Sequence, residues 1–165
     1  MSLPIRFLTR HALVMLAASL LAGCAMFGDK KEEASLQIFE QVSDTLPNHM
    51  IRPVKVPKIG LTIPVAPYPS LTDKDLHVAE LVPTPGGASI LMRFDPTGIM
   101  VLTELTTRCR GRYLVTFLNG QPVSAWLCNR ILDKGQLLVE GDFTDEQARK
   151  AVESLNKAAN KRAGR

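Results

Sequence analysis

Histidine and cysteine are the side chains of this sequence most able to ligate a metal or act as nucleophiles, and there are three of each. His11, His49 and His77 lie far apart, and none has an acidic or cysteine neighbour at the spacing of a zinc motif. The sequence also lacks a G-x-S-x-G elbow, an H-E-x-x-H pair and a P-loop. We therefore expect a protein that is not an enzyme and that holds no metal and no cofactor.

Cys109 and Cys128 are the two thiols whose spacing could form a covalent link. Asn119-Gly120 is a strong hairpin turn, because both positions tolerate positive φ, and it sets a register in which paired residue numbers sum to 239. Cys109 would then lie opposite Arg130, diagonally from Cys128 and on the same side. That geometry allows a disulfide if the chain bends near the helix end, and two buried free thiols are the alternative. The C-x-x-C spacing of a redox-catalytic pair is absent.

Cys24, the third cysteine, follows a segment with the parts of an export signal. Arg6 and Arg10 give it a positive start, residues 12–21 are apolar, and small residues precede the cysteine. The apolar run is too short to span a bilayer comfortably, since that takes roughly 20 residues. We predict that residues 1–23 are a signal peptide that is removed before Cys24.

Leu21-Ala-Gly-Cys24 resembles the lipobox of bacterial lipoproteins. In that family the cysteine sulfur takes up a diacylglycerol, the signal is cut before it and the new amine is acylated. The resemblance therefore implies acyl chains such as palmitate on Cys24, and several such chains anchor a protein stably. Ala25 stands where Asp commonly marks inner-membrane retention, which implies an outer-membrane protein facing the periplasm. The alternative is an ordinary secretory signal with an incidental cysteine.

The chain beyond the signal divides by composition into a tether and one domain. Residues 24–34 are polar and charged, which predicts a flexible tether. Residues 36–42 could be a short strand or a helical turn, and their partial alternation favours the strand. Six of the eleven prolines follow within residues 35–70, at a spacing that forbids a helix or a central strand. We expect this segment to be extended, with edge strands at most, and packed on a domain of residues 71–159. A basic tail, 160–165, would follow.

Residues 71–159 carry the sequence patterns of an α+β domain. Five short segments read as strands, and two longer ones repeat apolar residues every three or four positions, as amphipathic helices do. Asp95-Pro96 is typical of a helix N-cap followed by proline, and Thr144-Asp-Glu-Gln147 is a capping box. The order β-β-α-β-β-β-α predicts an antiparallel sheet of four or five strands with two helices on one face. The predicted strands are 77–82, 88–94, 113–118, 121–127 and 136–140.

These residues resemble the periplasmic head subdomain of SecD, a membrane component that assists protein export in bacteria. The resemblance implies a SecD-head fold and a domain of the kind that contacts an emerging polypeptide. It covers residues 71–156, in which the matching motifs are Leu71-Thr-Asp-Lys-Asp-Leu76 with Ala79, Phe94-Asp-Pro-Thr-Gly98, Gly111-Arg-Tyr-Leu114, Leu118-Asn-Gly-Gln-Pro-Val-Ser-Ala125, and Gly141-Asp-Phe-Thr144 with Glu146 and Ala148.

The departures from SecD limit what the resemblance implies. SecD has several membrane-spanning helices, a second periplasmic subdomain and a SecF partner, and nothing after residue 23 could span a membrane. The membrane charges that couple SecD to the proton gradient have no counterpart, so a proton-driven motor is not expected. Trp126 stands where SecD usually has proline, and we consider it either a partner contact or a core residue. Residues 24–70 lie outside the match.

The net charge argues against a nucleic-acid binder. It is +4, and loss of the signal with Arg6 and Arg10 leaves +2. We expect an envelope lipoprotein held at the membrane by Cys24, with a non-enzymatic domain that binds a protein or polypeptide and is accessory to protein export. The alternatives are a structural envelope lipoprotein that packs against one fixed partner, and an uncharacterised hydrolase with scattered catalytic residues.

Overall fold

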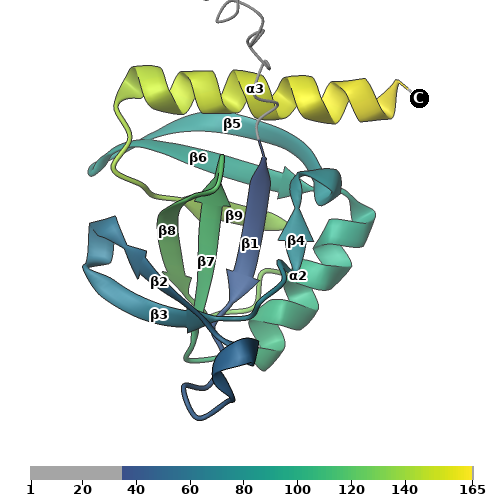
Figure 1. The fold of residues 1–165 in the computed structure, drawn as a ribbon. Helices are drawn as coiled ribbons and strands as arrows, with labels where there is room; N and C mark the ends of the chain where they lie inside the picture. The colour runs from purple at the N-terminus through teal and green to yellow at the C-terminus, as the bar shows by residue number, and fades with distance from the viewer. Residues whose placement is uncertain (1–34, 165) are drawn as a thin grey trace, which may run out of the picture. The chain divides into compact units, whose positions relative to one another are not determined.

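The computed structural model describes residues 35–164, which form an α+β domain as the sequence predicts (Figure 1). The predicted signal peptide, Cys24 and the predicted tether lie outside the described residues. The strands are β1 (Leu36–Glu40), β2 (Arg52–Val56), β3 (Leu61–Val65), β4 (Leu71–Thr72), β5 (Leu76–Thr84), β6 (Gly87–Phe94), β7 (Tyr113–Leu118), β8 (Gln121–Leu127) and β9 (Gln136–Val139). The helices are α2 (Pro96–Arg108) and α3 (Asp145–Ala163), with short 3-10 turns η3 (Asn48–Met50), η4 (Pro57–Ile59) and η5 (Asp73–Asp75).

The strands are divided among three antiparallel sheets. A four-stranded sheet has the order β4-β1-β7-β8, a three-stranded sheet has the order β5-β6-β9, and β2 pairs with β3 in a separate hairpin. The sequence predicted one sheet of four or five strands. The strands in the second half of the chain could be predicted because apolar and polar residues alternate along them. Alternation does not indicate which strands pair with one another.

Strand β1 lies inside the four-stranded sheet, although we expected its segment to pack on the outside of the domain. It pairs with β7 along its whole length, from Leu36 to Glu40, and with β4 at two positions. Leu36 and Ile38 face one hydrophobic core and Phe39 faces another, so both faces of the strand are buried. A strand buried on both faces carries apolar residues in succession, which explains its incomplete alternation.

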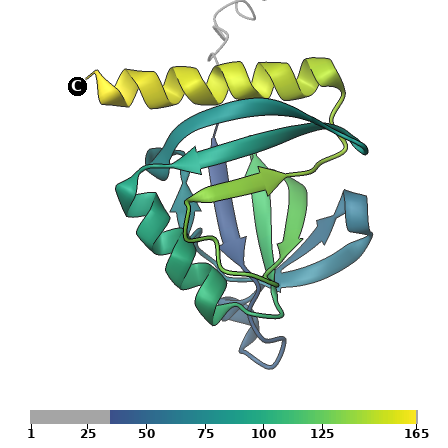
Figure 2. The same ribbon diagram turned by 180° about the vertical axis from the view of Figure 1, so that it is seen from behind.

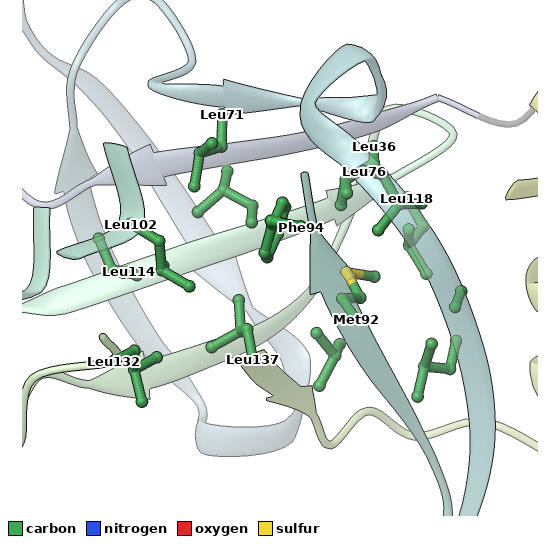
Figure 3. Close-up of a cluster of buried hydrophobic side chains, with 14 of the residues drawn as sticks. Leu36, Leu71, Leu76, Met92, Phe94, Leu102, Leu114, Leu118, Leu132 and Leu137 are labelled. Carbon is green, nitrogen blue, oxygen red and sulfur yellow. The ribbon is translucent and has the colours of Figure 1, made fainter. Parts of the chain in front are cut away.

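The larger core joins one face of the four-stranded sheet to the three-stranded sheet and to both α-helices (Figure 3). Leu114 comes from the four-stranded sheet, Met92 and Leu137 from the three-stranded sheet, and Leu102 and Leu155 from the helices; each is at most 1% exposed. Complete burial of such a side chain stabilises a fold by about 1.5–3 kcal/mol. Both amphipathic helices therefore contribute their apolar faces to the same core.

A smaller core lies on the other face of the four-stranded sheet, beneath the β2–β3 hairpin. The rings of Phe39 and Phe117 meet edge to face with centroids 5.0 Å apart. The Arg52 guanidinium lies 5.6 and 5.0 Å from the same two centroids, within cation–π range. Pro53 and Pro64 pair across the hairpin, and a two-stranded sheet tolerates them because each strand has an edge that donates no ladder hydrogen bond.

Both α-helices begin where the sequence predicts. The Asp95 carboxylate accepts a hydrogen bond from the Gly98 N–H at 2.8 Å. Thr144 and Gln147 form the predicted reciprocal capping box. Helix α3 continues to Ala163, so it includes most of the segment that we expected to be a basic tail.

Helix α3 lies along β5, the edge strand of the three-stranded sheet (Figures 1 and 2). The Asn156 amide accepts a hydrogen bond from the Ala79 N–H at 2.8 Å and donates one to the Ala79 carbonyl at 2.9 Å. Near the end of the helix, Arg162 forms an ion pair with Asp73 at 2.9 Å. Asn156 therefore occupies backbone groups at the β5 edge as a neighbouring strand would.

The β7–β8 hairpin departs from the predicted register. Its turn is Asn119-Gly120, with both residues at positive φ, as predicted. A bulge next to Thr116 then shifts the remaining pairing by one residue, and the Cys128 N–H donates to the Arg112 carbonyl at 2.9 Å. Cys109 is the C-cap of α2 and does not lie on the β7 ladder. The predicted register holds only beside the turn. Beyond it, the bulge adds one residue to one strand, and the composition of the strand gives no sign of this.

We expect Asn156→Ala to lower the free energy of unfolding by about 1–3 kcal/mol, because two backbone groups of Ala79 lose their partner. Urea unfolding of the chain from residue 25 onward measures this loss. Asn160→Ala is the matched control: Asn160 is exposed one turn later in the same helix, and its replacement should change stability by less than about 0.5 kcal/mol. Equal losses in the two variants would contradict an edge-capping role.

Candidate binding groove

A groove follows β8 between the η4 turn and the start of α3. It consists of two cavities, of about 430 and 100 Å³, both of which are lined in part by Lys58. We call these two cavities the β8 groove. The apolar residues that line the larger cavity are Pro57, Leu118, Pro122, Val123, Phe143 and Ala151.

The η4 turn forms one wall of the groove and comes from the proline-rich segment. Pro57 occupies its first position, and Gly60 ends it with φ at +67°, a left-handed conformation that favours glycine. Lys58 and Ile59, which lie between Pro57 and Gly60 in the chain, line the smaller cavity together with residues of β8 and β9. The sequence predicted an extended segment here, and its prolines gave no signal that it would reach β8.

The opposite wall is formed by the residues that lead into α3 and by its first turns. The Phe143 ring fills the space beside Gly141, where an added Cβ would come within 2.5 Å of ring atoms. Glycine is therefore needed at Gly141 for the ring to lie where it does. Ala151 and Lys150 extend this wall, and the Lys150 ammonium pairs with Glu146 at 2.6 Å.

Trp126 has one part against the larger core and another part in the groove. It is half-buried, packs against the residues of that core, and lines the smaller cavity with Ile59, Leu138 and Glu140. The packing against the core agrees with one of the two interpretations that the sequence left open. Its role as a partner contact stays a prediction.

The β8 groove combines an apolar lining with charges of both signs. Lys58 and Lys150 are its basic residues, and Asp142 and Glu140 are its acidic ones. Pockets that bind by desolvation have this composition: mostly apolar walls and a few polar groups that orient the ligand. Within residues 35–164, no three His, Cys, Asp or Glu side chains are placed to hold a metal ion.

Cys109 lies beside Glu40, a carboxylate that also binds an arginine, and Cys128 lies close to Cys109. Glu40 accepts hydrogen bonds from Arg108 Nε and Nη2, both at 3.0 Å, and from Cys109 Sγ at 3.2 Å. Burial, followed by the hydrogen bond to Glu40, raises the pKa of Cys109 to about 11. Burial, followed by the proximity of Cys109, raises the pKa of Cys128 to about 12. Both thiols are therefore protonated at neutral pH and are weak nucleophiles.

Sequence reasoning missed the contact of Glu40 with Arg108, because the two residues lie 68 positions apart. The only local signal is a charged residue at the end of an apolar strand. Cys109 and Cys128 are buried free thiols in the structure, and the disulfide between them stays a prediction. Cys24, the predicted lipid site, lies outside the described residues.

The fold resembles that of solved SecDF structures. A crystal structure of SecDF in a super-membrane-facing form is 20% identical over 75% of this chain and 19% of that chain, with a TM-score of 0.59. A structure of SecDF described as a membrane component that enhances protein export is 20% identical over 74% of this chain and 62% of that chain, with a TM-score of 0.58. The chain thus spans less than two thirds of either SecDF chain, and the predicted SecD-head-like fold is confirmed.

Other comparisons limit what can be carried over from this likeness. No family model matches the chain, and no curated protein matches it. Within residues 35–164, no helix is both long and apolar enough to cross a membrane. At 20% identity the resemblance establishes the fold, and a function must be argued from the surfaces of this chain.

We expect Glu40→Gln to speed alkylation of Cys109 several-fold, because its carboxylate no longer raises the pKa of that thiol. The folded, pre-reduced protein is treated with iodoacetamide from pH 8 upward, and each cysteine is followed by mass spectrometry. In the wild type both rates should rise with pH towards 11, as the thiolate fraction grows. Cys128 is the internal control, since Glu40 does not contribute to its raised pKa.

An equal acceleration at both cysteines would indicate general unfolding and contradict a local effect of Glu40. The same measurement, made on unfolded protein that has not been reduced, tests the predicted disulfide. A bridged Cys109–Cys128 pair would resist alkylation and appear as one linked peptide. Complete alkylation of both residues would exclude the bridge.

Proposed function

We propose that this protein is a lipid-anchored module of the bacterial cell envelope that binds extended segments of polypeptide and is accessory to protein export. The observation that carries the proposal is the SecDF-like fold of the domain, since one of the SecDF structures is of a membrane component that enhances protein export. The proposal is for a binding protein without enzymatic activity. A fold can serve unrelated functions, so a suitable binding surface is also required.

The β8 groove supports the proposal as that surface. Its apolar residues and the half-buried Trp126 offer contacts for apolar side chains of a client, and its charges lie among them. Aromatic side chains such as tryptophan are enriched among the residues that dominate binding energies at protein interfaces. The two adjoining cavities suit successive side chains of an extended chain better than one rigid small molecule.

Two of the sheet edges, those of β5 and of the β2–β3 hairpin, favour binding through side chains over addition of a strand. Asn156 of α3 occupies the Ala79 backbone at the β5 edge. Pro53 and Pro64 interrupt the hairpin strands, and proline cannot donate to an added strand. Both features are devices that keep sheet edges from pairing with other chains. We therefore place the client in the β8 groove.

The membrane anchor rests on the sequence of residues 1–24. An export signal and the lipobox Leu21-Ala-Gly-Cys24 together support acylation of Cys24, and Ala25 supports the outer membrane. Eleven residue steps separate Cys24 from Ser35, which spans at most roughly 35–40 Å of extended chain. Such a tether would leave the domain room to reach clients in the periplasm.

We expect Cys24→Ser to abolish incorporation of radiolabelled palmitate and to leave an unprocessed or soluble product, because the acceptor sulfur is absent. The measurement compares labelled protein from cells that express the wild type and the variant. Cys109→Ser is the matched control and should be labelled normally. Normal labelling of Cys24→Ser would overturn the anchor.

We expect Trp126→Ala to weaken binding of an unfolded model protein by about tenfold, since a groove contact made by tryptophan is typically worth more than 1 kcal/mol. Binding is followed by tryptophan fluorescence in the wild type and by anisotropy of a labelled client in both proteins. Far-ultraviolet circular dichroism should remain unchanged. Trp126 also touches the larger core, so a second variant is needed.

Lys150→Trp provides that second variant, because Lys150 is exposed and a bulky side chain there would obstruct the larger cavity. Lys157→Trp, on an exposed position two turns later in α3, is its control and should bind as the wild type does. Failure of the folded wild-type protein to bind any of several unfolded clients at tens of micromolar would favour the alternative. That alternative is a structural envelope lipoprotein that packs against one fixed partner.

A further inference from the structure

A separate cavity, of about 820 Å³, lies next to the C-terminal end of β1, where Gln41 and Val42 follow the strand. Its walls come from the segment that follows β1, from the two strands of the hairpin and from Arg112, just before β7. Val42, Ile51 and Pro64 are half-buried apolar residues of this lining. None of its lining residues belongs to the β8 groove, so this is a separate site.

Arg112 differs from the other half-buried arginines of residues 35–164. Arg93 forms an ion pair with Glu80 at 3.1 Å, and Arg162 forms one with Asp73 at 2.9 Å. Arg112 has no carboxylate at ion-pairing distance among the residues described. It lines the 820 Å³ cavity without an ion pair to a side chain.

The hydrogen bonds of Arg112 hold its side chain in place without cancelling its charge. Nη2 donates to the Arg108 carbonyl, at the end of α2, at 2.8 Å, and Nη1 donates to the Gln41 carbonyl at 3.4 Å. A guanidinium has five N–H donors, so three remain for a ligand. Glu40, the nearest carboxylate along β1, is already engaged by Arg108 through two hydrogen bonds.

We infer that this cavity binds an acidic segment of an extended polypeptide, with Arg112 pairing with a carboxylate and the apolar walls receiving neighbouring side chains. The guanidinium fork matches the planar, two-oxygen geometry of a carboxylate. The volume exceeds what a single carboxylate would fill, and Val42, Ile51 and Pro64 would be desolvated only by apolar groups beside it. Asp44 also lines the cavity and is exposed, so it weakens the attraction for an anion.

The test uses the full chain in a non-ionic detergent and a fluorescein-labelled decapeptide of alternating Asp and Leu, with an Asn–Leu peptide of the same length as control. Anisotropy should show binding of the Asp peptide, weaker binding in higher salt, and at least tenfold weaker binding of the Asn peptide. Arg112→Gln should weaken Asp-peptide binding at least tenfold. Arg112→Lys should fall between, because it keeps the charge and loses the fork.

Arg130→Gln is the matched charge control, since Arg130 is exposed and does not line this cavity. Asp44→Asn should tighten binding about two- to fivefold by removing a repulsive charge. Thr62→Trp, on the exposed side of β3, should block the cavity while Arg112 itself remains unsubstituted. It remains informative if Arg112→Gln unfolds. Trp126→Ala should leave this binding unchanged, which separates the site from the β8 groove.

Equal weakening by Arg112→Gln and Arg130→Gln would show that the peptide responds only to overall charge, and would overturn the inference. Equal binding of the Asp and Asn peptides would also overturn it. So would a change of oligomeric state in Arg112→Gln without any binding of peptide by the wild type, because the cavity would then serve a second copy of this chain.

Discussion

Burial of β1 on both faces is the constraint on which the rest of the structure depends. Leu36 and Ile38 complete the larger core, and Phe39 completes the smaller one. The strand also pairs with β4 on one side and with β7 on the other, so its backbone holds together the four-stranded sheet that separates the two cores. Without β1, β7 would become an edge strand and each core would lose a wall. The last residue of the strand, Glu40, extends the same role by binding Arg108 at the end of α2.

Polar side chains take over at the places where apolar packing ends. Asn156 satisfies the Ala79 backbone at the open edge of β5. Thr106 of α2 accepts a hydrogen bond from the backbone N–H of Leu132 at 3.1 Å and thereby ties the loop between β8 and β9 to the helix. A buried backbone group without a partner costs about 1–3 kcal/mol, so each of these side chains stabilises backbone groups that no neighbouring strand pairs with.

The proline-rich hairpin contributes to both surfaces that we propose for binding. Its turn, with Pro57 and Lys58, forms a wall of the β8 groove. Its strands, with Pro53 and Pro64, form a wall of the cavity that contains Arg112. The hairpin packs on the sheet through the smaller core beneath it, so both walls belong to one element that rests on Phe39 and its neighbours. The segment that lies outside the SecD-like motifs thus shapes both sites.

Features that depend on neighbouring residues were determined by the sequence alone. The caps at Asp95 and Thr144 and the turn Asn119-Gly120 involve residues a few positions apart, and each lies where predicted. Among the residues that line the β8 groove, Trp126 is the one that the sequence analysis considered as a partner contact. Prolines marked the hairpin segment as irregular without indicating the surface it would cover.

Tertiary structure decided the place of β1 in the sheet, the bulge that moves Cys128 beside Arg112, and the lack of an ion pair at Arg112. It also decided contacts such as that of Asn156, which lies 77 residues from its partner. Alternation and composition indicate whether a residue is suited to burial, but they do not indicate which strand will be its partner. Which groups meet, and which charged side chain has no ion-pair partner, depends on residues far apart in the chain that only the packed fold brings together.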